Sequence, residues 1–127
     1  MDRRCIVPDN GPPAVGPYSP AVIAGGLVFI SGQIPQDTET GKLEIESFRA
    51  QCVRVFENMK IVLEAAGASL ESVVKVTVFL TDLEQFSEMN SVYERYFGTG
   101  KPARACVQAA RLPKDVAIEA DAIAVLP

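Results

Sequence analysis

One arginine and two carboxylates stand among small apolar residues in the last quarter of the chain. Arg104 lies between alanines in a predicted strand over residues 103–110, and Glu119 and Asp121 lie in a second predicted strand over residues 116–126. A guanidinium is costly to bury without an anion, and its fork of donors fits a carboxylate at two points. Because we expect the two strands to form a hairpin, Arg104 either binds a carboxylate ligand or forms a structural ion pair with Glu119 or Asp121.

Several side chains and motifs common in enzymes are missing from this sequence. It contains no histidine, and its three cysteines, Cys5, Cys52 and Cys106, show no CxxC spacing. A zinc site and a disulfide framework are therefore not expected. The sequence also has no GxGxxG fingerprint and no GxxxxGK[ST] phosphate loop, so we expect neither a metal nor an organic cofactor.

Length and composition favour a single domain over residues 1–127, and the charge bears on its partners. A chain of 127 residues is long enough for a sizeable core. The formal net charge is −4 and no basic run is present, which argues against nucleic acid as a partner. No apolar stretch has the length of a membrane span, and the first residues do not resemble a signal peptide. We expect a reduced, cytoplasmic protein, with mitochondrial targeting left open.

Hydrophobic periodicity predicts an α/β fold with helices on one face of a mixed sheet. Strands are expected over residues 21–24, 27–31, 73–80, 103–110 and 116–126, and helices over 48–66 and from 83 to 97. Ser47 is the expected N-cap of the first helix and Gly67 its stop. Strand 73–80 is apolar on both faces and should be central. Residues 10–20 are rich in glycine and proline and should form a loop that carries Tyr18.

Alanines are concentrated in the last two predicted strands. Small residues on an uncovered sheet face allow another subunit to approach closely, which favours an interface there. The alternative is that these alanines make room for bulky side chains of the helices.

With these elements placed, the sequence resembles the Rid family, also called YjgF, of reactive enamine/imine deaminases. The resemblance covers about residues 12–125. It rests on GPYS at 16–19, GLVFISGQIP at 26–35, EAAGASL at 64–70, VFLTD at 78–82, MNSVY at 89–93 and the stretch 102–124. Each stretch alone is weak evidence for the family, but six stretches in register are a specific signal. Ala105 departs from the family pattern, in which a serine is frequent between the arginine and the cysteine.

The resemblance implies a chorismate-mutase-like fold and a homotrimer with active sites in clefts between subunits. It also implies hydrolysis of 2-imino acids such as 2-iminobutanoate and 2-iminopropanoate to 2-oxo acids and ammonia, without a cofactor. Arg104 would hold the substrate carboxylate. The residues expected to line the cleft are Tyr18, Ser31, Gly32, Asn90, Cys106 and Glu119.

These residues suggest how a protein without histidine can catalyse a hydrolysis. An imine is already prone to attack by water, so positioning matters more than a strong nucleophile. Glu119 is the candidate for orienting the water and moving its proton. Cys106 is expected to act through its backbone, and Asp121 is expected to be structural. Two other functions remain open: a non-catalytic regulatory trimer that binds small carboxylates, and an endoribonuclease or translation inhibitor.

Overall fold

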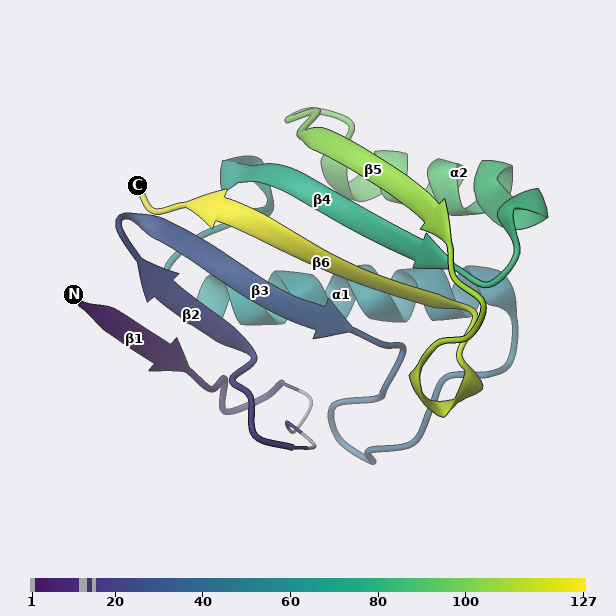
Figure 1. Cartoon of the computed structure of the whole chain (residues 1–127), viewed down its shortest axis with the longest axis horizontal. Helices are drawn as coiled ribbons and strands as arrows, with labels where there is room; N and C mark the ends of the chain where they lie inside the picture. Colours follow the sequence, from purple (N-terminus) through teal and green to yellow (C-terminus); the bar gives the residue numbers. More distant parts are fainter. Residues whose placement is uncertain (1, 12–13, 15) are drawn as a thin grey trace.

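Two helices pack side by side on one face of a six-stranded mixed sheet in the computed structural model of the chain (Figure 1). The structure describes residues 2–11, 14 and 16–127. The helices are α1 (Phe48–Ala65) and α2 (Phe86–Phe97), and the strands are β1 (Arg3–Ile6), β2 (Ala21–Ala24), β3 (Leu27–Gln33), β4 (Val73–Leu80), β5 (Ala103–Gln108) and β6 (Ile118–Val125). The predicted fold class is therefore confirmed. Of the predicted loop over residues 10–20, positions 12, 13 and 15 lie outside the described residues.

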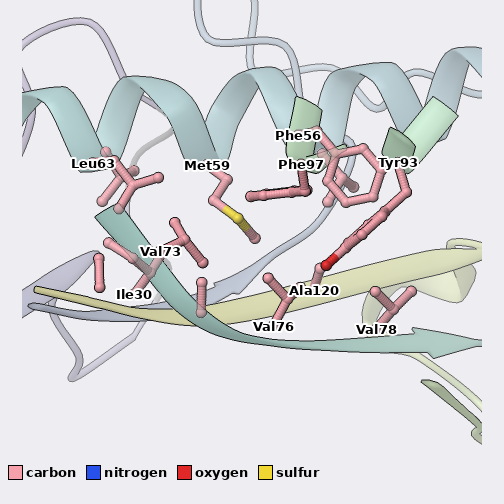
Figure 2. Packing of buried hydrophobic residues seen from close by; sticks show 14 of the residues in the cluster. Ile30, Phe56, Met59, Leu63, Val73, Val76, Val78, Tyr93, Phe97 and Ala120 are labelled. Carbon is pink, nitrogen blue, oxygen red and sulfur yellow. The ribbon is translucent and has the colours of Figure 1, made fainter. Parts of the chain in front are cut away.

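Helix α1 begins and ends where the sequence predicts. The Ser47 hydroxyl accepts a hydrogen bond from the Ala50 N–H at 3.0 Å, which caps the first turn. Gly67 follows the last turn with φ of +85°, a left-handed conformation that glycine adopts without strain. The buried face of α1 carries large side chains, including Phe56, Met59 and Leu63, that reach down to the sheet (Figure 2). In the described part of the chain, no helix is long and apolar enough to cross a membrane.

The strand order, β1-β2-β3-β6-β4-β5, shows that the predicted hairpin of the last two strands is wrong. Strand β6 lies between β3 and β4 and is antiparallel to both, whereas β5 is parallel to β4 at the sheet edge. Val76 on β4 therefore has Arg104 on one side and Ala122 on the other. The physical reason is burial: β6 has a fully apolar face suited to the sheet centre, and β5 is mostly exposed.

The alanines of β6 lie under the helices, so their interpretation as a subunit-facing surface is also wrong. Ala120, Ala122 and Ala124 belong to the buried core, because alternate residues of a strand point to the same face. They leave room for the large side chains of α1, which was the alternative reading of the sequence. On β5, in contrast, Ala103 and Ala105 are exposed.

Replacing Ala122 with leucine should therefore damage the core. Ala122 lies at 3% exposure beneath the helices, and inserting extra methylene groups into a packed core costs about 1–3 kcal/mol of unfolding free energy. Urea unfolding followed by circular dichroism measures this loss, with leucine at the exposed Ala110 as a neutral control. Unchanged stability of Ala122→Leu would contradict this placement.

The opposite face of the sheet is not covered by any described element and carries an apolar patch. Phe29 and Val107 are 42% and 44% exposed. Phe29 pairs with Ile123 across β3 and β6, and Phe79 pairs with Val107 across β4 and β5. We call these four residues the open-face patch. These two pairs are separated on the open face by polar residues, since Ile123 pairs with Lys75 and Thr77 pairs with Asp121 across β6 and β4. Exposed apolar side chains on an uncovered sheet face provide surface for an interaction.

Candidate active site

Arg104 is held by three side chains of α2 that leave its charge unneutralised. Its Nη1 donates a hydrogen bond to Asn90 Oδ1 at 2.6 Å. The guanidinium carbon lies 4.6 Å from the ring centroid of Tyr93 and 5.4 Å from that of Phe86. Within the described residues Arg104 forms no ion pair, so the alternative of a structural pair with Glu119 or Asp121 is wrong. This leaves a half-buried cation available to an external anion.

Cys106 lies two residues further along β5, on the same face of the sheet as Arg104. Burial raises the pKa of its thiol, and the neighbouring Arg104 charge partly opposes that rise. Cys52, buried in α1 as expected, has a pKa raised to about 12, chiefly by burial. Both thiols are thus protonated at neutral pH and poorly suited to act as nucleophiles.

The Cys106→Ala variant should consequently keep its turnover rate within a few-fold of the parent, because no thiolate step is expected. The rate of the hydrolysis that the family resemblance implies, measured per folded molecule, checks this, with Cys52→Ala as a control for packing effects. Inactivation of the folded protein by a thiol-alkylating reagent that modifies Cys106 would point instead to a covalent mechanism.

A second group of predicted residues lines a pocket of about 480 Å³. Its lining includes Tyr18, Ser31, Gly32, Lys114 and Glu119. The Ser31 hydroxyl donates a hydrogen bond to the Ser19 carbonyl at 2.6 Å, which ties the loop that carries Tyr18 to the end of β3. Gly32 lets the Glu119 carboxylate lie close to the backbone, because a Cβ there would overlap that carboxylate and the side chain would have to shift. We call this the glutamate pocket.

The surroundings of Glu119 make its carboxyl group easier to protonate than an ordinary glutamate. Burial raises the pKa of its carboxyl group above the ordinary value, and the negative charge of Asp121 raises it further. The pKa of Asp121 is also raised by burial, but a hydrogen bond from Thr77 and the charge of Lys75 oppose that rise. A carboxyl group with a raised pKa, beside a pocket, is a candidate general acid–base group.

The predicted site residues fall into two clusters on opposite faces of the sheet. Arg104 and Cys106 share the helix-covered face with Asn90, because Val76 and Val78, their partners on β4, are buried there. Glu119 alternates with the buried Ile118 and Ala120 and so points to the uncovered face. One chain therefore does not bring Arg104 and Glu119 to the same small molecule.

Three neighbours of these residues were missed by the sequence analysis. Phe86 and Tyr93 flank Arg104, and Lys114 lines the glutamate pocket. Positions 86, 90 and 93 have the spacing of one helix face, which is a readable signal once Asn90 is singled out. Lys114 lies in a turn with positive φ angles, 56° at Lys114 and 58° at Asp115. The sequence has no glycine there to indicate such a turn, so the position of Lys114 could not be predicted.

Comparisons with known proteins identify the class of protein to which this fold and site belong. The sequence model of the family described as endoribonuclease L-PSP matches residues 9–126. The 2-iminobutanoate/2-iminopropanoate deaminase of Salmonella typhimurium is 46% identical, over 96% of this chain and 97% of its own length. This chain therefore belongs to the endoribonuclease L-PSP family, which is the YjgF/Rid family that the sequence motifs indicate.

Two crystal structures show the same fold. A Thermotoga maritima protein named as a candidate endoribonuclease superposes with a TM-score of 0.96 at 50% identity, covering 100% of this chain and 99% of that one. TdcF of Escherichia coli, solved with bound serine, superposes with a TM-score of 0.91 at 42% identity, covering 98% and 99%. The names of these relatives thus include both a deaminase and an endoribonuclease.

Proposed function

We propose that this protein hydrolyses reactive 2-imino acids, including 2-iminobutanoate and 2-iminopropanoate, to 2-oxo acids and ammonia. The observation that carries the proposal is Arg104, a half-buried cation fixed by an amide and two aromatic rings and without a carboxylate partner in the described structure. A 2-imino acid supplies the missing carboxylate. The relative named as an imine deaminase supports the same reaction.

Each residue has a definite part in the proposed reaction. Arg104 binds the substrate carboxylate through N–H donors that Asn90 does not occupy. A water molecule held beside Glu119 attacks the imine carbon, and Glu119 accepts a proton from it. Return of that proton to the imine nitrogen completes the carbinolamine. Glu119 then accepts the proton of the carbinolamine hydroxyl and delivers it to the amino nitrogen, so that the C–N bond breaks, the C=O bond of the 2-oxo acid forms and ammonia leaves. Ser31 and Gly32 line the place where this water would be held.

The proposed site is shared between two copies of the chain. Since Arg104 and Glu119 lie on opposite faces of one sheet, the Arg104 edge of one copy must meet the glutamate pocket of another. The open-face patch offers apolar surface for such an assembly. We propose the homotrimer that the family resemblance implies, placed in the cytoplasm and acting without a nucleic-acid partner or a cofactor.

Imine hydrolysis can be tested directly by generating 2-iminobutanoate in situ with an amino-acid oxidase, in the presence of catalase. The proposal predicts that catalytic amounts of this protein accelerate the release of 2-oxobutanoate and ammonia above the spontaneous rate. A heat-denatured sample is the control. A rate equal to the spontaneous one for the folded oligomer would refute the deaminase assignment.

One alternative function is favoured by a specific observation. The serine bound to TdcF is consistent with a protein that holds small carboxylates without turning them over. Such a module requires Arg104 but not Glu119. Binding of 2-oxobutanoate together with an absence of imine hydrolysis would favour this alternative over the enzyme.

A further inference from the structure

The partners of Arg104 hold it in a way that keeps it available for an anion. Phe86, Asn90 and Tyr93 lie on one face of α2, at helical spacings of four and three residues. Asn90 accepts one of the five N–H donors that a guanidinium carries. An aromatic ring attracts a cation through its quadrupole and neutralises none of its charge. Three neutral partners therefore fix the arginine without competing for its anion.

Tyr93 is the most firmly fixed of these partners. Its side chain is only 7% exposed. Its ring packs edge-on against Phe56, with centroids 5.7 Å apart, and lies 4.7 Å from the ring of Phe97. Figure 2 shows Tyr93 extending from α2 toward the sheet beside these two rings. Phe86, in contrast, is 36% exposed. The Tyr93 ring is thus a rigid surface against which the guanidinium lies.

The hydroxyl group of Tyr93 does not explain why an aromatic ring occupies this position. It is buried and has no hydrogen-bond partner among the described residues. A buried hydroxyl without a partner is destabilising. The contribution of Tyr93 to the site must therefore come from its ring face.

We propose that Tyr93 is a positioning residue for the reaction, acting through Arg104. Its ring holds the guanidinium in one orientation, so that the donors left free by Asn90 are presented to the substrate carboxylate before the substrate arrives. This inference rests on the proposed function for the identity of the substrate. Because the carboxylate is held equally in the ground state and in the transition state, the ring affects KM more than kcat.

Three variants separate the ring face from the hydroxyl and from general packing. Tyr93→Leu removes the ring, and the size of cation–π interactions predicts a rise in KM of about 2- to 30-fold with kcat nearly unchanged. Tyr93→Phe keeps the ring and removes the unpaired hydroxyl, so KM should stay near the parent value and the melting temperature should not fall. Tyr96→Leu is the matched control, because Tyr96 is an aromatic residue of the same helix that packs on Phe56 with ring centroids 5.5 Å apart. In the described structure its ring contacts neither Tyr93 nor Arg104, so its KM should not change.

A double-mutant cycle tests whether Tyr93 acts through Arg104. In an Arg104→Ala background, Tyr93→Leu should produce no further loss in kcat/KM. An equal loss in both backgrounds would overturn the proposal and assign Tyr93 to packing alone. A rise in KM for Tyr96→Leu as large as that for Tyr93→Leu would also assign the effect of Tyr93 to packing.

A spectroscopic measurement on the unmodified protein tests the same contact without any change at Tyr93. In a ¹⁵N-labelled sample, the Arg104 Nε–H resonance, assigned by its loss in Arg104→Lys, should be shifted by the ring currents of its aromatic neighbours. A resonance at the position typical of exposed arginines would overturn the proposal.

The failure of the proposed function can be distinguished from the failure of this inference. If the unmodified protein binds 2-oxobutanoate but hydrolyses no imine, the deaminase assignment fails, and the Tyr93 variants are then compared by their Kd for 2-oxobutanoate. If the protein is active and Tyr93→Leu leaves KM unchanged, the positioning role fails while the deaminase assignment stands.

Discussion

Replacing Arg104 with alanine is expected to lower kcat/KM for 2-iminobutanoate by about 30-fold to several-thousand-fold. This range corresponds to the roughly 2–5 kcal/mol lost when one partner of a buried, hydrogen-bonded charge pair is removed. The loss is large because Arg104 is half-buried and because no carboxylate in the described structure forms an ion pair with it in competition with the substrate. Steady-state kinetics with imine generated in situ measures it.

Two further variants test whether the loss belongs to the arginine fork. Arg104→Lys should recover little activity, because an ammonium group cannot bind a carboxylate through two parallel donors. Arg95→Ala removes an exposed arginine from the last turn of α2 and should leave the rate unchanged. Full activity of Arg104→Ala would refute the carboxylate assignment.

Replacing Glu119 with glutamine is expected to lower kcat by about 100- to 10,000-fold, the usual contribution of a positioned general acid–base group. As a base, Glu119 must be ionised. Because burial and the Asp121 charge raise its pKa, the ionised fraction and the rate should fall as the pH is lowered through a value above the ordinary glutamate range. The pH profile of the catalysed rate, corrected for spontaneous hydrolysis, should therefore show an acidic limb that is absent in Glu119→Gln.

The neighbouring carboxylate provides a control for this assignment. Asp121→Asn removes a negative charge that raises the pKa of Glu119, so the acidic limb should move to lower pH while the plateau rate is largely kept. An acidic limb that persists unchanged in Glu119→Gln would show that another group titrates.

The sequence predicts the local elements well and their long-range pairing poorly. Strand β4 and the cap and stop of α1 were found from periodicity and capping residues, which are local signals. The pairing of β5 and β6 was predicted from their closeness in sequence, but β6 joins β3 and β4 instead. Strand β1 was missed because its residues, RRCI, are mostly exposed and show no alternation of apolar and polar residues.

The candidate site shows the same division. The motifs indicate the residues of the site. They do not indicate that Arg104 and Glu119 lie on opposite faces of the sheet, because that depends on how β5 and β6 each pair with β4, the strand between them. Nor does the sequence show which partners an arginine will take. Glu119 and Asp121 are plausible ion-pair partners for Arg104 by proximity along the chain, whereas the structure supplies Asn90 and two aromatic rings from α2.

The central claim, a deaminase site built from two copies of the chain, is tested most directly by mixing two inactive variants. Arg104→Ala and Glu119→Gln are dissociated together, reassembled at equal concentrations and assayed for imine hydrolysis. In a closed ring of identical contacts, about a quarter of the sites then hold both native residues, so about a quarter of the parent activity should return. Reassembly of Arg104→Ala with the double variant is the control and should restore none. No recovery in the first mixture, despite proven subunit exchange, would contradict the shared site.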